Sequence, residues 1–351
     1  MDGTTKFSKS MKHNLVLIFS FFCYWLGIDS LFYFLNRKAK RIITFHNVLP
    51  QGILPNKRII GLTDSEETFR LKIREIKKQF PISVDIADYK SATITFDDGY
   101  LNQAEVAGRI LQEEGDIPAI IFAAGRMIDN KDPHKSLIVD LLLHWTYLVP
   151  NGEYTLTLDQ QSPFLLEITN DNRNLIWQKV IWPSFVGDTF SMGQHLLAAL
   201  DKLYPIKDIL LKCNKEYLRL RLTGISQSNI KDLSQKGWLI GWHTYNHYPL
   251  SCMTREDKMK EISELASQSM KNIVFSYPYG ECFSVDEETI RIAEESGYPC
   301  AVSNTIAGGN FNEKYFLPRL MLSDNKYLIH FELSGLKYFL KRKKLFPNFN
   351  N

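Results

Sequence analysis

Two short polar segments hold the residues of this chain that could do chemistry. The first is Asp97-Asp98-Gly99, within TFDDGY, and the second is the pair His243 and His247, within HTYNH. One carboxylate and two imidazoles form a three-ligand set for a divalent metal ion, with coordination positions left for water and substrate. The other carboxylate would then be free to act as a base beside the metal.

Each polar segment follows an apolar run that is typical of a β-strand. Neighbouring side chains on a strand point to opposite faces, so two adjacent aspartates converge only where the strand gives way to a loop. Gly99 permits that break, because glycine tolerates positive φ. The first segment alone could equally be a turn that caps a strand. The two histidines would face the same way on one helical turn, or could be two unrelated surface residues.

With these two segments and a third, the chain resembles the NodB-homology polysaccharide deacetylases, carbohydrate esterase family four. The family motifs TFDDG and H-[ST]-x-x-H are both complete here. The third motif, R-x-P-[YFW]-G, appears as SYPYG at residues 276–280, with Ser276 where the family has Arg. The resemblance extends from about residue 41 to about residue 322. Its late FLPRL segment is similar to the exopolysaccharide-deacetylase branch.

The resemblance implies an α/β fold, a distorted (β/α) barrel of the NodB type with both polar segments at the carboxyl ends of its strands. It implies that Asp98, His243 and His247 bind a divalent metal ion, with Zn²⁺ expected first and Co²⁺, Mn²⁺ or Ni²⁺ as alternatives. It also implies that Asp97 is the base and that the backbone N–H of Tyr279 stabilises an oxyanion.

The activity implied in this way is hydrolytic removal of N-acetyl groups from amino sugars of a polysaccharide, in modification of a bacterial surface or exopolysaccharide. The implied partner is an N-acetylated glycan. Two alternatives stay open: a deformylase or deacetylase of a lipid-linked amino sugar, and a catalytically silent glycan-binding module.

Two further family motifs, a late Leu-x-His and D-x-x-D-W, have no clear match. The late motif usually supplies the catalytic acid, so His46 becomes the candidate acid, at the end of the first predicted strand. Its alternative role is structural, as is the role expected for His330 in a C-terminal helix. Ser276 lacks the charged fork with which arginine orients a carboxylate, and Arg319 could supply that charge from a late strand.

Composition is that of a globular protein. The chain has 351 residues, 44% hydrophobic and 23% charged, with a net charge of +3. The near-neutral balance and the lack of a basic stripe disfavour nucleic-acid binding. The five cysteines are scattered and form no C-x-x-C pair, so they indicate neither a zinc cluster nor a disulfide framework. Composition leaves the oligomeric state open.

Residues 1–40 are expected to form an apolar helix. The stretch from Leu15 to Leu35 is 21 residues long, interrupted near its end by Gly27 and Asp29, with basic residues on both sides. It could span a bilayer, lie on its surface, or pack on the domain. No small-residue cleavage site follows it. The basic, aromatic tail at 336–351 would suit an anionic lipid surface or be a solvated helix end.

Between these ends, residues 41–335 are expected to form one deacetylase-like domain, because helical and strand patterns alternate along them. Helices are predicted at 63–80, 102–114, 230–236, 254–271 and 284–296. An insert of about 95 residues, 130–224, breaks this rhythm. Within it, helices are predicted at 136–148, 174–181, 192–203 and 206–219, and strands at 154–158 and 164–168. Its aromatic residues could face a glycan or form the core of the insert.

Overall fold

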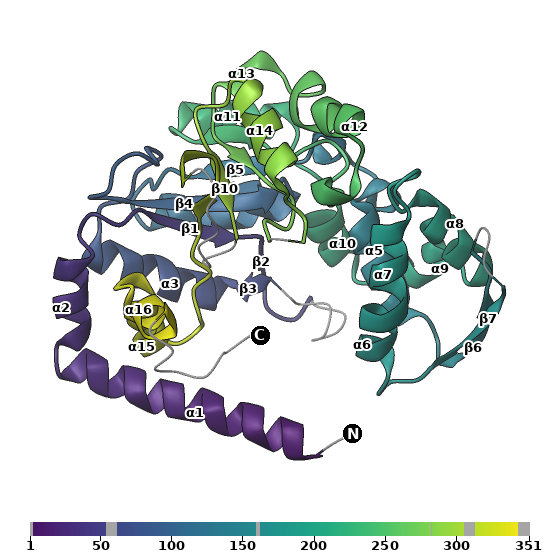
Figure 1. The fold of residues 1–351 in the computed structure, drawn as a ribbon, viewed down its shortest axis with the longest axis horizontal. Coiled ribbons are helices and arrows are strands. Elements are labelled where there is room, and N and C mark those ends of the chain that lie inside the picture. Colours follow the sequence, from purple (N-terminus) through teal and green to yellow (C-terminus); the bar gives the residue numbers. More distant parts are fainter. Residues whose placement is uncertain (1–2, 54–61, 159–161, 282, 305–312, 343–351) are drawn as a thin grey trace.

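The computed structural model describes residues 3–53, 62–158, 162–281, 283–304 and 313–342. Within these residues, seven parallel strands form the central sheet, in the order β1-β4-β5-β8-β9-β10-β11 (Figure 1). They are β1 (Arg41–Phe45), β4 (Ala92–Asp98), β5 (Ile120–Ala123), β8 (Leu239–Trp242), β9 (Phe275–Ser276), β10 (Ala301–Ser303) and β11 (Leu317–Pro318).

The last strand returns to the first. Just beyond β11, the backbone N–H of Leu320 donates to the carbonyl of Ile42 at 2.7 Å, and its own carbonyl accepts from Thr44 at 2.9 Å. This pairing closes the sheet on itself. The distorted (β/α) barrel expected from the sequence is therefore confirmed.

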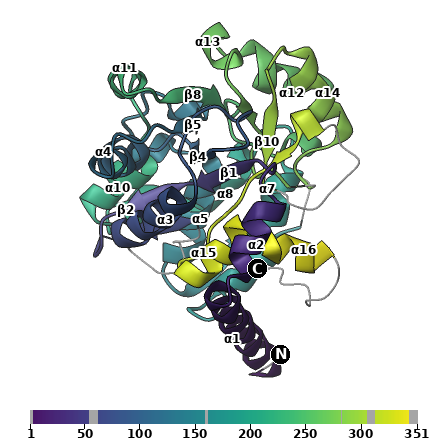
Figure 2. The same cartoon turned by 90° about the vertical axis from the view of Figure 1, so that its left-hand side faces the viewer.

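The strands are buried because helices cover the outside of the barrel (Figures 1 and 2). All seven residues of β4 are buried, as is usual for a parallel strand with both faces covered. The covering helices include α3 (Glu66–Gln79), α4 (Gly108–Glu113), α11 (Gln227–Gln235), α12 (Arg255–Met259) and α14 (Glu287–Glu295). The apolar face predicted for α3 is fully buried at Phe69, Ile73 and Ile76.

Several helix boundaries differ from the prediction. The helix predicted from residue 63 begins at Glu66, because Thr63–Ser65 forms β3 and pairs with β2 (Asn47–Leu49). The helix predicted over 284–296 is capped by Asp286, whose side chain accepts from the Thr289 N–H. The helix predicted over 254–271 is interrupted by a π-helical turn over Lys260–Glu264 and resumes as α13 (Gln268–Lys271).

The segment between β5 and α11 forms a helical body beside the barrel (Figure 1). Its elements are α5 (Ile138–Leu148), β6 (Gly152–Leu156), β7 (Phe164–Ile168), α6 (Arg173–Ile176), α7 (Trp182–Gly187), α8 (Gln194–Leu203), α9 (Ile206–Leu210) and α10 (Lys215–Leu222). The helix predicted over 206–219 is two helices, because Asn214 caps the second. Trp145 and Phe185 are buried in the core of this body, whereas Trp182 reaches the barrel.

The N-terminal segment forms two helices, α1 (Gly3–Trp25) and α2 (Ile28–Leu35). They pack beside the C-terminal helices α15 (Lys326–Leu333) and α16 (Leu336–Arg342), and both views place α1 at the margin of the molecule (Figures 1 and 2). Among the described residues, no one helix meets the length and hydropathy needed to cross a bilayer; Asn14–Trp25 and Ile28–Leu35 meet them only as a pair, bent by 80°.

Candidate active site

The turn that brings the two aspartates together begins at Asp98 itself. Asp98 has φ +81° and Gly99 has φ +82°. A positive φ is costly for a residue with a Cβ, and such strain is found mainly at functional sites. Gly99 is needed for a second reason, since a Cβ there would lie 3.0 Å from the Cβ of Ala123 on β5. The break expected at Gly99 thus starts one residue earlier.

The two histidines lie in a loop after β8, so the expectation that they share a helical turn is wrong. Thr244 and His247 both have positive φ, +61° and +56°. The loop is held by Glu261, whose carboxylate accepts from the backbone N–H groups of Tyr245 and Asn246 at 2.7 and 2.9 Å. These charge-assisted bonds stabilise the loop. Its two positive φ angles are incompatible with a right-handed helix. The two imidazole rings still meet, with centroids 4.9 Å apart.

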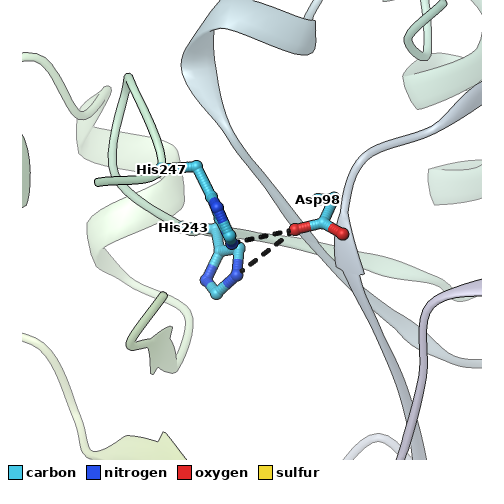
Figure 3. Close-up of side chains that lie close together, drawn as sticks. All are labelled: Asp98, His243 and His247. Atoms are coloured by element: carbon cyan, nitrogen blue, oxygen red, sulfur yellow. Dashed lines mark ion pairs between the residues drawn. The ribbon is translucent and has the colours of Figure 1, made fainter. Parts of the chain in front are cut away.

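Asp98, His243 and His247 point toward one another (Figure 3). The Oδ1 of Asp98 lies 3.6 Å from Nε2 of His243 and 3.1 Å from Nε2 of His247. All three residues are buried. Metal–ligand bonds of about 2.0–2.2 Å in a tetrahedral site place two ligand atoms about 3.4 Å apart, so these spacings suit Zn²⁺ or a similar ion.

The chemistry of the donor atoms also suits a metal. The ring Nδ1 of His243 lies 2.7 Å from the carbonyl oxygen of Ser276. A carbonyl only accepts, so Nδ1 carries the proton and the lone pair of Nε2 faces the other two ligands. Burial lowers the pKa of His243 to about 4, which keeps the ring neutral. For His247, attraction by Asp98 outweighs the effect of burial and raises the pKa.

Asp97 is held by Arg319, just beyond β11. The guanidinium makes two parallel bonds, Nη1 to Oδ1 at 2.6 Å and Nη2 to Oδ2 at 2.5 Å. Ser276 adds a hydroxyl bond to Oδ1 at 3.2 Å. Burial alone would raise the pKa of Asp97, but Arg319, and then His243, outweigh it, so the pKa lies below its usual range. The structure thus brings together Asp97, the predicted base, and Arg319, the arginine predicted to supply its charged partner.

His46 directly follows β1, and its side chain lies beside Asp97. Its Nε2 is 3.6 Å from Oδ2 of Asp97, and 13% of its side chain is exposed. The side-chain amide of Gln103 donates to the backbone carbonyls of both His46 and Asp97, which fixes the two strand ends together. A small shift of the ring, or one bridging water, would therefore bring His46 into hydrogen-bond contact with Asp97, the predicted base.

Tyr279 borders the three candidate ligands. Its ring centroid lies 4.7 Å from that of His247, and its hydroxyl donates to the His247 carbonyl at 3.3 Å. Its φ of +62° is maintained by Asn304, whose side-chain amide donates to the Tyr279 carbonyl at 3.1 Å. Trp182 of α7 packs edge-on against the Tyr279 ring, at 5.3 Å between centroids.

One buried network beside the site was not predicted. Tyr100, which follows the first motif, donates to Asp140 at 2.6 Å, and Arg221 binds both oxygens of Asp140 at 2.7 and 3.0 Å. Asp140 and Arg221 come from α5 and α10, far apart in sequence. The one available signal was an acidic residue within the largely apolar sequence of α5. The Glu261 contact had no such signal.

Residues 204–301, which contain the second and third motifs, match the family model described as polysaccharide deacetylase. A search of curated proteins finds no match.

Similar solved structures share little sequence with the chain. The deacetylase PplD of Streptococcus pyogenes has 14% identity, a TM-score of 0.47, and coverage of 85% of this chain and 96% of that one. IcaB of Ammonifex degensii has 13% identity, a TM-score of 0.45, and coverage of 85% and 98%. The family-model match covers residues 204–301 and supports the resemblance carried by the motifs, which implies a hydrolase that acts on N-acetyl amide bonds.

Proposed function

We propose that the chain is a metal-dependent deacetylase that removes N-acetyl groups from amino sugars of a bacterial surface polysaccharide or exopolysaccharide. The observation that carries the proposal is the convergence of Asp98, His243 and His247 next to the Asp97–Arg319 pair. A carboxylate base beside a three-ligand site, with coordination positions left over, is what hydrolysis of an amide requires.

In this proposal Asp98, His243 and His247 hold a divalent ion, with Zn²⁺ expected first. When bound, the ion would polarise the amide carbonyl and acidify water at the site. The ionised Asp97 accepts the proton of the attacking water. Arg319 fixes both oxygens of Asp97, so the carboxylate is already oriented when the substrate arrives.

The remaining steps belong to Tyr279 and His46. The backbone N–H of Tyr279 donates to the oxyanion that forms on the amide carbon. His46 delivers a proton to the leaving amine, because an amine cannot depart as its anion at neutral pH. A histidine from the first strand would thus replace the acid that the late family motif provides.

Acetate release from a poly-N-acetylglucosamine or chitin oligomer tests this function, with and without a chelator. We expect activity that is lost with the chelator, restored by Zn²⁺ or another divalent ion, and reduced by at least about 10³-fold in Asp97→Asn. Activity that survives both chelation and Asp97→Asn would refute the proposal. A chain that binds glycan but releases no acetate would instead be the silent binding module.

A second candidate is removal of a formyl or acetyl group from a lipid-linked amino sugar, at a membrane. The exposed apolar residues of α1 and α2 favour it, among them Trp25 and Phe34. Membrane association through this segment is part of the proposal for either substrate. Turnover of a soluble oligomer against that of a lipid-linked monomer in vesicles separates the two candidates.

A further inference from the structure

Helices α1 and α2, together with the turn that joins them, expose a series of large apolar residues, called here the outer stripe. Its members are large apolar side chains, each more than half exposed. This outer stripe consists of Leu15, Ile18, Phe22, Trp25, Leu26, Leu31, Phe34 and Leu35. Trp25 is 65% exposed and Leu26 is 71% exposed. Several large apolar side chains this exposed and this close together in sequence are rare on a surface that contacts only water. The outer stripe therefore requires a partner.

The opposite side of α1 already has a partner within the chain. Phe21 and Tyr24 pack on Tyr327 of α15 at centroid distances of 5.0 and 5.4 Å. Cys23 is 1% exposed in the same contact. Farther along, the Tyr33 hydroxyl of α2 lies 3.2 Å from Nδ1 of His330. The helix pair is thus attached to the domain along one face while the outer stripe stays open.

Charge next to the outer stripe indicates the partner. Arg37, Lys38 and Lys40 follow α2 directly and are all exposed. The one acidic residue of the two helices among those whose side chains are described, Asp29, is buried at their junction. An apolar face bordered by exposed cations is complementary to a bilayer that carries anionic headgroups. A second copy of this chain would bring the same cations together, which disfavours self-association.

We infer that α1 and α2 lie in the plane of an anionic bilayer surface, with the outer stripe inserted and the α15-facing side held by the protein. The 80° bend between the helices and the contacts of Tyr24 and Tyr33 with α15 oppose a straight span. A spanning arrangement would separate α1 from α15 and leave the aromatic side chains of both without their present partners. The inference rests on the membrane association included in the proposed function, and it adds how the two helices meet the bilayer.

The test is co-flotation of the full chain with vesicles of phosphatidylcholine alone or mixed with phosphatidylglycerol. We expect binding to the mixed vesicles and at least about tenfold weaker binding to the neutral ones. The double variant Phe22→Glu/Trp25→Glu should reduce binding to the mixed vesicles by at least about tenfold. A matched control, Leu165→Glu/Phe190→Glu, changes two exposed apolar residues of the insert and should leave binding unaltered.

Three outcomes would overturn the inference. The first is vesicle binding that the outer-stripe variant does not weaken. The second is resistance of the bound protein to alkaline carbonate extraction, which indicates a membrane-spanning helix. The third is a dimer, detected by light scattering, that the same variant dissociates. Acetate release from a soluble oligomer is measured on each variant. It should stay within about twofold of the unaltered chain, so failure of the inference is distinguishable from failure of the proposed function.

Discussion

In the Asp97–Arg319 pair, Arg319 supplies the charged partner of Asp97 that the family motif would place at position 276. Arg319 is fully buried and makes two short parallel bonds to Asp97, while Ser276 contributes one neutral hydrogen bond. A guanidinium supplies a bidentate, permanently charged partner, which a hydroxyl cannot do. The arginine expected in the third motif is therefore replaced, in space, by an arginine that follows the last strand.

Arg319→Met is expected to abolish most activity and to destabilise the fold. It leaves Asp97 charged, buried and without its main partner, a change that costs about 3–5 kcal/mol in the free energy of unfolding. We expect kcat to fall at least about 10²-fold, measured by acetate release, with the loss of stability measured by urea unfolding. Ser276→Ala is the matched control and should cost only about 1 kcal/mol. Equal effects of the two variants would contradict this assignment.

His46→Gln tests whether His46 is the acid that protonates the leaving amine. The substitution keeps the size and a polar tip but removes the group that can deliver a proton, so kcat for an N-acetyl amine should fall about 10²–10⁴-fold. An aryl acetate ester, whose leaving group departs without a proton, should be affected by less than about tenfold. Loss of the same size on both substrates would mean that His46 has a structural role.

At the scale of elements, the α1–α2 junction contains a titratable group that the fold disfavours in its charged state. Burial raises the pKa of Asp29 from its ordinary value of 3.8 to about 6. Neither of its oxygens accepts a hydrogen bond of good geometry within the described residues. A folded-state pKa above the unfolded one means that the stabilising contribution is complete below about pH 4 and is lost as the pH rises through about 6.

Asp29→Asn should therefore stabilise the chain at pH 7.5 and leave its stability almost unchanged at pH 4. The neutral amide avoids the cost of a buried charge, which we take as about 1–2 kcal/mol after allowing for partial solvent access. Urea unfolding at the two pH values measures the difference. The prediction is wrong if the variant is stabilised equally at both.

A second element-scale contact links the insert to the site. Trp182 of α7 packs against Tyr279 and, at 5.8 Å, against Phe283. Because the Tyr279 ring also contacts His247, α7 supports the loop that carries the third motif. Trp182→Ala removes both ring contacts, each worth about 1 kcal/mol. We expect a several-fold fall in kcat/KM for oligomers, checked by acetate release, whereas Phe190→Ala, which changes an exposed aromatic residue of the insert, serves as the control.

At the scale of the whole molecule, the sequence predicted what depends on local pattern and missed what depends on long-range contact. The strand runs, the apolar face of α3 and the three motifs are local, and each lies where the pattern indicated. The loop of His243 and His247 was wrongly expected to be helical, because the Glu261 carboxylate that holds it is 14 residues beyond His247. The Tyr100–Asp140–Arg221 network likewise joins segments that meet only in the folded chain.

The proposed metal site would also contribute to the stability of the whole molecule. Asp98 ends β4, and the two histidines follow β8, so a shared ion would link two strand ends that β5 separates. A ligand that binds only the folded state stabilises it by about 2.7 kcal/mol at a free concentration 100 times its Kd. We expect a chelator to lower Tm by about 3–6 °C and Zn²⁺ to restore it. Asp98→Asn, which keeps the shape but weakens the ligand set, should be nearly insensitive to both additions. An unchanged Tm in the unaltered chain, with no metal in the purified protein, would contradict the assignment of Asp98, His243 and His247 as ligands.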